Sequence, residues 1–237
     1  MPDVIKKAKK EKDKSNEEGD WHSHLQIWWR HWRGRPELFE VLKDKQRYIA
    51  VSRVTKRPIF EFVSTKIHPG DALIAFTFED DYSFGILQSG LHGQWFREKC
   101  STLKGDFRYT ADSIFDTFVW PQNPTKSQTK KVADAAVQLR ELRNKILEEN
   151  KWGLKDLYRT LDLPGKNPLK DAHAKLDNAV KEAYGMSERD NPLSFLLELN
   201  SEVAKLELSQ KPVQSPGLPK CVKDAKSLIT SDCIEAD

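Results

Sequence analysis

The spacing of apolar residues changes near residue 124, and this change limits what the chain can fold into. Before it, apolar residues come in short runs rich in β-branched and aromatic side chains, such as Tyr48–Val51 and Ile59–Val63, which suit a half-buried sheet. After it, they recur in steps of three and four residues, the period of an amphipathic helix. We therefore predict an α+β protein, with a mixed or antiparallel β domain followed by an α-helical bundle region.

Capping residues mark the helices of the second half. Thr125 and Gln128 fit a capping box, and Asn167 and Asn191 each stand before a proline that suits the first position of a helix. Gly185 is a stop signal. Four helices are expected, over residues 125–150, 154–161, 167–185 and 193–208.

Shorter elements are expected before residue 124. They are helices over 36–43 and 91–99, strands over 72–78 and 82–89, a polar loop over 101–110 and an alternating apolar segment over 113–120. The acidic turn Glu79–Asp81 separates the last two strands. We expect its carboxylates to stay solvated rather than to hold a metal ion.

Composition divides the chain into four parts. Residues 1–20 mix charges and hold almost no apolar side chains, so they cannot offset the entropy of ordering and are expected to be a disordered tail. Residues 209–237 are rich in Pro, Ser and Lys and are expected to be a second disordered tail. Between them we predict a β-rich domain over 21–123 and a helical region over 124–208.

The sequence predicts an intracellular, cytoplasmic protein. No apolar run approaches the roughly 20 residues that span a bilayer, and the charged start lacks a signal-peptide core. Cys100, Cys221 and Cys233 are scattered and fit neither a zinc site nor a disulfide framework, so reduced thiols are expected.

Positive charge is concentrated in one part of a chain whose net charge is only +3. Residues 21–70 carry ten basic and four acidic side chains, whereas residues 71–122 carry four and eight. The connector Arg53–Pro58, between the first two predicted strands, places three cations within five residues, and their repulsion is relieved by water or by a polyanion. This pattern fits a nucleic-acid-binding loop and an ordinary solvated hairpin tip equally well.

Residues 21–35, WHSHLQIWWRHWRGR, interleave four tryptophans with arginines and histidines. Large aromatic side chains dominate protein cores, so we expect the tryptophans to pack and the arginines, Arg33 and Arg35 among them, to contact phosphate. The three histidines lack an accompanying set of cysteines or carboxylates, and no metal site is predicted.

Motifs of common catalytic sites are missing from the chain. It has no G-x-G-x-x-G, no phosphate-binding G-x-x-x-x-G-K-[ST], no G-x-S-x-G and no H-E-x-x-H. Its one E-x-K triplet, Glu149 to Lys151, falls at the end of a predicted helix, where surface charge explains it better than nuclease chemistry. By itself the chain does not look catalytic.

Three segments of the first half and one of the second resemble a known family. The runs RYIAVSRVTKRPIFEFV, HPGDALIAFTFEDDYSFGILQSGLH and CSTLKGDFRYTADSIFDTFVWPQ resemble the target recognition domain of type IIG/IIL (MmeI-like) restriction–modification adenine-specific DNA methyltransferases. The run LRELRNKILEENKWGLKDLYRTLDLPGKNPLKDAHAKLDNAVKEAYGM resembles their C-terminal helical region. The resemblance is collinear over about residues 28–208.

The resemblance implies sequence-specific recognition of double-stranded DNA. In this family a separate domain binds S-adenosylmethionine and methylates a flipped-out adenine, through an Asn-Pro-Pro-Tyr type of motif that this chain lacks. The chain is therefore expected to bind no cofactor itself. The loops carry over as candidate DNA-contacting elements, and the residues implied are Arg33, Arg35, Arg53, Thr55, Lys56, Arg57, Lys104, Arg108 and Tyr109.

Two further interpretations remain open at this point. The chain could be a protein-interaction module whose helical face and tryptophans dock a separately encoded methyltransferase subunit. It could also be a site-specific DNA methyltransferase by homology that is inactive alone.

Overall fold

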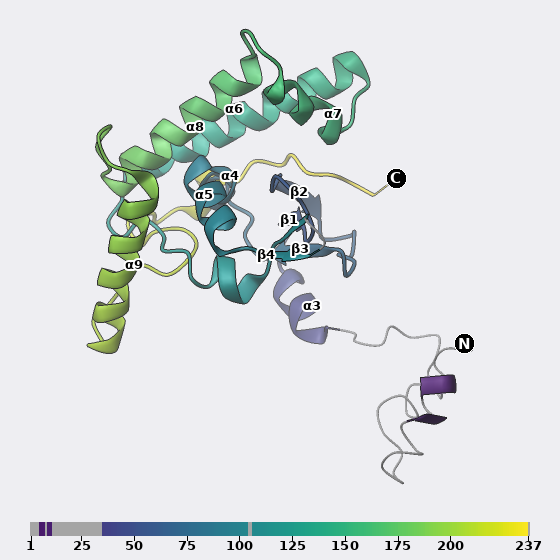
Figure 1. The fold of residues 1–237 in the computed structure, drawn as a ribbon, viewed down its shortest axis with the longest axis horizontal. Coiled ribbons are helices and arrows are strands. Elements are labelled where there is room, and N and C mark those ends of the chain that lie inside the picture. The colour runs from purple at the N-terminus through teal and green to yellow at the C-terminus, as the bar shows by residue number, and fades with distance from the viewer. Residues whose placement is uncertain (1–4, 8, 11–34, 104–105, 237) are drawn as a thin grey trace. The chain divides into compact units, whose positions relative to one another are not determined.

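The computed structural model describes residues 5–7, 9–10, 35–103 and 106–236 (Figure 1). The chain divides into two units, residues 1–44 and 45–237. In the first unit, helix α3 (Pro36–Leu42) begins at its proline as predicted. The tryptophan-rich segment 21–34 and most of the predicted tail 1–20 lie outside the described residues. The predicted domain boundary at residues 123 and 124 falls inside the second unit.

A three-stranded antiparallel sheet in the order β2-β1-β3 opens the second unit. Its strands are β1 (Arg47–Ser52), β2 (Glu61–Ser64) and β3 (Leu73–Phe76). Strand β1 pairs Ile49 with Phe62 on one side and with Phe76 on the other. The strands predicted around Tyr48–Val51, Ile59–Val63 and residues 72–78 are thus confirmed.

Helices form most of the rest of the unit. After the sheet come α4 (Asp81–Gln88), α5 (Gly90–Lys99) and the hairpin of β4 (Ser101–Leu103) and β5 (Asp106–Arg108), followed by a π-helical turn, η1 (Ala111–Phe115). The second half contains α6 (Lys126–Asn150), α7 (Leu154–Arg159), the 3-10 turn η2 (Thr160–Asp162), α8 (Pro168–Tyr184), α9 (Pro192–Leu208) and a second 3-10 turn, η3 (Ala225–Leu228). Helices α6 and α8 lie side by side, and α4 packs against α6 (Figure 1).

The capping signals of the second half are confirmed. Thr125 and Gln128 form both bonds of the predicted capping box at the start of α6. Asn167 and Asn191 cap α8 and α9 with their side chains, and Gly185 ends α8 in the left-handed conformation that favours glycine. These bonds are local in sequence, which explains why the sequence located the helices well.

The segment 82–89 is a helix rather than the predicted strand. Asp80 caps α4 by accepting a hydrogen bond from the Ser83 amide, and every residue of α4 is buried. Because the helix is enclosed on all sides, its apolar residues show no helical period. Gly85 is the point of closest approach, since a Cβ there would lie 2.7 Å from Cγ1 of Val132 in α6.

Two other short elements also differ from expectation. The predicted polar loop 101–110 contains the β4–β5 hairpin. The alternating segment 113–120 lies partly in the π-helical turn η1, and its large side chains Phe118 and Trp120 are buried outside any strand. Aromatic packing in this part of the core fixes the chain without a regular ladder.

Residues 209–236 follow a defined course instead of the expected disordered tail. The Ser64 amide donates to the Ile234 carbonyl at 2.9 Å, and the Ile234 amide donates to the Phe62 carbonyl at 2.9 Å. Ile234 thereby forms a parallel bridge with Val63 at the free edge of β2. Figure 1 shows this segment in yellow, passing between the sheet and α6. The long-range bonds of this segment leave no periodic signal in its own sequence.

None of the helices in the described part of the chain combines the length and the apolar character that crossing a membrane requires.

Candidate nucleic-acid interface

The structure brings together the two basic segments that the sequence singled out. The connector between β1 and β2 lies against strand β5, because Val54 forms an antiparallel bridge with Arg108. The Thr55 amide donates to the Phe107 carbonyl at 3.0 Å, and the Tyr109 amide donates to the Arg53 carbonyl at 2.8 Å. The connector, taken here as residues 53–60 between the two strands, and the β4–β5 hairpin therefore form one continuous surface element, which we call the basic loop pair (residues 53–60, 101–103 and 106–110).

Three cations of the basic loop pair are available to a partner. Lys56 and Arg108 are exposed and Arg53 is half-buried. None of their side chains makes an ion pair or hydrogen bond with another described residue. Positive charge that no nearby carboxylate compensates attracts polyanions, and the attraction weakens with salt.

The connector is held at three places rather than hanging free. Its start is bonded to β5, as described above. In its middle, Arg57 donates from Nη1 to the Tyr158 carbonyl at 2.7 Å and from Nη2 to Oδ1 of Asp162 at 2.8 Å. At its end, the Phe60 amide donates to Oε1 of Gln88 at 2.9 Å. A loop fixed in this way loses little conformational entropy when it binds.

Thr55 shapes the turn of the connector. Its hydroxyl donates to the Arg57 carbonyl at 2.6 Å and accepts from the Arg57 amide at 3.1 Å. Side-chain bonds of this kind stabilise a local turn. Both capacities of the hydroxyl are thus engaged within the connector.

Tyr109 differs from the prediction that it contacts DNA. It is fully buried, and its ring stacks on Phe96. Nδ1 of His92 lies 2.8 Å from the Leu87 carbonyl, so Nδ1 carries the proton and Nε2 accepts from the Tyr109 hydroxyl at 3.0 Å. Burial lowers the pKa of His92 to about 4, which agrees with this neutral tautomer. Tyr109 is thus the residue of the basic loop pair that belongs to the core.

The remaining predicted residues lie elsewhere. Arg35 is exposed at the N-terminal end of α3, in the first unit, with a positive φ of 46°. Arg33 and Lys104 lie outside the described residues. In the described part of the chain, no group of three or more His, Cys, Asp and Glu side chains converges to hold a metal ion.

The acidic turn 79–81 is not solvated as expected. Asp80 and Asp81 are buried, the first as the cap of α4 and the second as a partner of two arginines. Arg47 of β1 donates from Nη2 to Oδ1 of Asp81 at 3.0 Å and from Nε to the Glu79 carbonyl at 2.9 Å. The turn therefore joins the sheet to α4.

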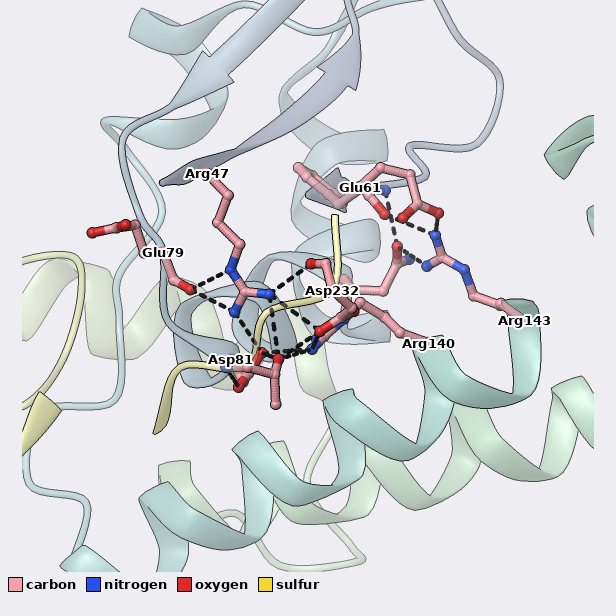
Figure 2. Close-up of polar contacts among 10 residues, drawn as sticks. Arg47, Glu61, Glu79, Asp81, Arg140, Arg143 and Asp232 are labelled. Atoms are coloured by element: carbon pink, nitrogen blue, oxygen red, sulfur yellow. Dashed lines mark hydrogen bonds and ion pairs between the residues drawn. The ribbon is translucent and has the colours of Figure 1, made fainter. Parts of the chain in front are cut away.

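Three buried arginines, Arg47, Arg140 and Arg143, hold the sheet against α6 (Figure 2). Arg140 pairs with Asp81 and donates from Nε to Oδ2 of Asp232 at 2.7 Å. Arg143 pairs with Glu61 and donates to the Phe60 carbonyl at 3.0 Å. Buried cations need such partners because an unpaired charge in the interior is very costly. Through Phe60, this cluster also fixes the end of the connector.

Asp232 is the acidic residue of the arginine cluster that comes latest in the sequence. Burial alone would raise its pKa, but hydrogen bonds from Arg140 and Thr230 and the charges of Arg140 and Arg47 hold the pKa well below its ordinary value. The side chain is ionised throughout the physiological range, and it ties residues 230–234 to α6.

Sequence reasoning missed this arginine cluster, although α6 carries a signal for it. The buried positions Val132, Ala136, Leu139 and Arg143 follow steps of four, three and four residues. An arginine on the apolar face of a helix indicates a buried ion pair, so Arg143 was detectable in principle. The partners of Arg143 come from distant segments, so the sequence could not identify them.

Residues 29–122 match the family model described as MmeI, target recognition domain. This segment contains the sheet, α4, α5, the basic loop pair and η1, and it ends just before α6. The predicted resemblance to the target recognition domains of MmeI-like restriction–modification methyltransferases is thus confirmed for this part of the chain.

Two known proteins are similar to the chain over a larger part of its length than the family model. DNA methyltransferase A of Bacillus subtilis (strain 168) is 32% identical over 127 residues, which are 52% of this chain and 14% of that protein. The solved structure of the type IIL restriction–modification enzyme MmeI in complex with DNA superposes with a TM-score of 0.67 and 22% identity. It covers 79% of this chain and 24% of the MmeI chain, and it shows the same fold beyond residue 122. The chain thus spans well under half the length of either relative.

Proposed function

We propose that this chain recognises a specific sequence of double-stranded DNA, as the specificity part of an adenine-specific DNA methyltransferase or restriction–modification enzyme. One observation carries the proposal: within the segment that matches a target recognition domain, a firmly held loop pair presents Arg53, Lys56 and Arg108, and none of the three pairs with a carboxylate of the described residues. The MmeI structure, which is a complex with DNA, supports the choice of ligand.

The chemistry of the three cations suits DNA. A guanidinium can donate two parallel hydrogen bonds to O6 and N7 of guanine, and each good base contact contributes roughly 1–3 kcal/mol of discrimination. A lysine ammonium suits a phosphate, which positions the protein without reading sequence. We therefore assign base reading to Arg53 and Arg108 and phosphate contact to Lys56.

Other predicted residues take supporting roles in this proposal. Arg33, Arg35 and Lys104 remain candidate contacts to the DNA backbone. Thr55 acts by forming the turn, since its hydroxyl is engaged with Arg57. Tyr109 is omitted because it is buried.

We propose that a separate methyltransferase domain or subunit provides S-adenosylmethionine and the methyl transfer. This assignment rests on the sequence, which has no G-x-G-x-x-G and no Asn-Pro-Pro-Tyr motif.

The proposal is tested by selection from a library of duplexes with a randomised centre, using the full chain. Enrichment of one sequence motif is expected. Single changes of Arg53, Lys56 and Arg108 to Ala should weaken binding, and Lys56→Ala should reduce the salt slope by about one. A chain that enriches no motif, or whose binding and salt slope are unaltered by all three changes, would contradict the proposal.

A second candidate function is docking of a separately encoded methyltransferase subunit. It is favoured by helix α9, where Leu208 is 87% exposed and Leu197 is 43% exposed. Contiguous apolar surface marks contact sites, and these two leucines lie on one side of α9, about three helical turns apart. Capture of a purified methyltransferase subunit, with no gel shift of DNA by the chain alone, would favour docking over direct recognition.

A further inference from the structure

Arg57 differs from the other cations of the basic loop pair in having partners. Its guanidinium donates to the Tyr158 carbonyl in α7 and to the Asp162 carboxylate in η2, more than a hundred residues later in the sequence. Arg53, Lys56 and Arg108 have no such partner among the described residues. The basic loop pair thus carries two kinds of cation: Arg57, which the protein engages, and Arg53, Lys56 and Arg108, which no described residue engages.

We propose that Arg57 is a positioning residue: it joins the DNA-reading connector to α7 and η2 of the helical region, so that the helical region sets where Arg53 and Lys56 lie. The inference rests on the proposed function and refines it, because it moves Arg57 from the set of DNA-contacting residues to the support beneath them. It also assigns a role in sequence discrimination to Asp162 and to the α7 backbone.

The anchor on the helical side is well fixed. Tyr158 is buried, and its hydroxyl lies 3.0 Å from Nε2 of His173 in α8. The Arg143 guanidinium lies over its ring at 5.7 Å. Arg143 of α6 also donates to the Phe60 carbonyl. The middle and the end of the connector are therefore both bonded to the helical region. A shift of α7 would therefore move the connector.

A substitution at Asp162 can distinguish a phosphate contact by Arg57 from a positioning role, because the two roles predict opposite changes in DNA affinity. Asp162 is 68% exposed and carries a negative charge beside a surface proposed to bind DNA. If Arg57 contacted phosphate, removal of that negative charge would strengthen DNA binding at every sequence. If Arg57 positions the connector, the same removal loosens it and weakens binding to the preferred sequence.

The test compares Asp162→Asn with Asp156→Asn in the full chain. Asp156 lies on α7, pairs with Arg159 at 3.4 Å and makes no contact with the connector among the bonds described, so it controls for loss of one negative charge. Affinity is measured over a range of salt for the duplex that wild type selects and for a duplex of random sequence. Asp162→Glu serves as the conservative variant.

We expect Asp162→Asn to bind the selected duplex about fivefold more weakly than the control variant does. Its affinity for the random duplex should stay within about twofold of the control, and its salt slope should be unchanged because no phosphate contact is lost. Asp162→Glu should restore binding. Binding of the selected duplex by Asp162→Asn as tightly as by the control would overturn the positioning role.

Amide hydrogen exchange tests the positioning role of Arg57 without requiring DNA binding. If wild type binds no DNA, the proposed function fails, but exchange at the Thr55 and Arg57 amides still reports on the connector. Exchange at least about fivefold faster in Asp162→Asn than in the control would support the positioning contact. Equal exchange in the two variants would overturn it.

Discussion

Arg140 of α6 donates a hydrogen bond of 2.7 Å to the carboxylate of Asp232, 92 residues later in the chain. The same carboxylate accepts a bond of 3.2 Å from Arg47 of the sheet. One side chain from the last part of the chain thus pairs with two buried cations, one from each half of the fold, and it shares them with Asp81.

Replacement of Asp232 by Asn should destabilise the fold. Arg47 and Arg140 would then share the single charge of Asp81, and loss of one partner of a buried ion pair is costly. Asp232 is 37% exposed, so solvent reduces the effect to about 1–2 kcal/mol. Urea unfolding measures it, with Asp224→Asn, an exposed carboxylate in the same segment, as the control. Equal midpoints for the two variants would show that the pairing is unimportant.

Stability should fall when the pH is lowered from 7 to 5. Burial lowers the pKa values of His92 and His173 to about 4, below the value of about 6.5 in an unfolded chain. The unfolded chain therefore takes up protons first, and the stability present above pH 6.5 is lost as the pH falls toward 4, by up to about 3 kcal/mol for His92.

Replacement of His92 by Gln tests this assignment. The variant should be less stable than wild type at pH 7, but its stability should depend less on pH between 7 and 5. Chemical unfolding at several pH values measures the slope, and His173→Gln should remove a comparable share. Parallel slopes for wild type and His92→Gln would exclude His92 as a source of the pH dependence.

Gly85→Ala should destabilise the packing of α4 on α6. The added methyl group would meet Val132 Cγ1 at 2.7 Å and the Val132 carbonyl at 3.2 Å, and overpacking of this kind costs about 1–3 kcal/mol. Gly93 in α5 is the matched control, because a methyl group there meets nothing closer than 3.9 Å. Gly93→Ala should stabilise the helix by roughly 0.5–1 kcal/mol, so the two melting temperatures should move in opposite directions.

Tyr109→Phe should lower stability and leave the salt dependence of DNA binding unchanged. Loss of the hydroxyl removes the donor to Nε2 of His92, and an unsatisfied buried acceptor costs about 1–3 kcal/mol. The residue is fully buried, so no contact with DNA is removed. A reduced salt slope with unchanged stability would restore the original assignment of Tyr109 to the interface.

The sequence located elements whose signals are local. The capping box at Thr125 and the caps at Asn167 and Asn191 each involve neighbours within three residues, and the helices that follow them were predicted correctly. Helix α4 was misassigned as a strand because it is buried on all sides, so its apolar residues do not mark a single face.

The candidate site was predictable only in part, because local sequence signals do not show which distant residues contact it. A run such as Arg53 to Arg57 shows that charge is concentrated, but it does not show which cation is engaged. That distinction depends on Tyr158 and Asp162, which the fold brings to Arg57 from the second half of the chain. The burial of Tyr109 is likewise set by His92 and Phe96 in α5 and leaves no mark on its own loop.

The arginine cluster has a consequence for exchanging specificities between related chains. The segment that matches the target recognition domain ends at residue 122, but Arg47 within it depends on Asp232, and the edge of β2 depends on Ile234. A graft of residues 29–122 alone would keep Asp81 beside Arg47 but lose Asp232 and leave the edge of β2 open, so the host would have to replace both contacts. The transplantable module therefore extends from β1 to residue 236, with α6 and the C-terminal segment moved as one piece.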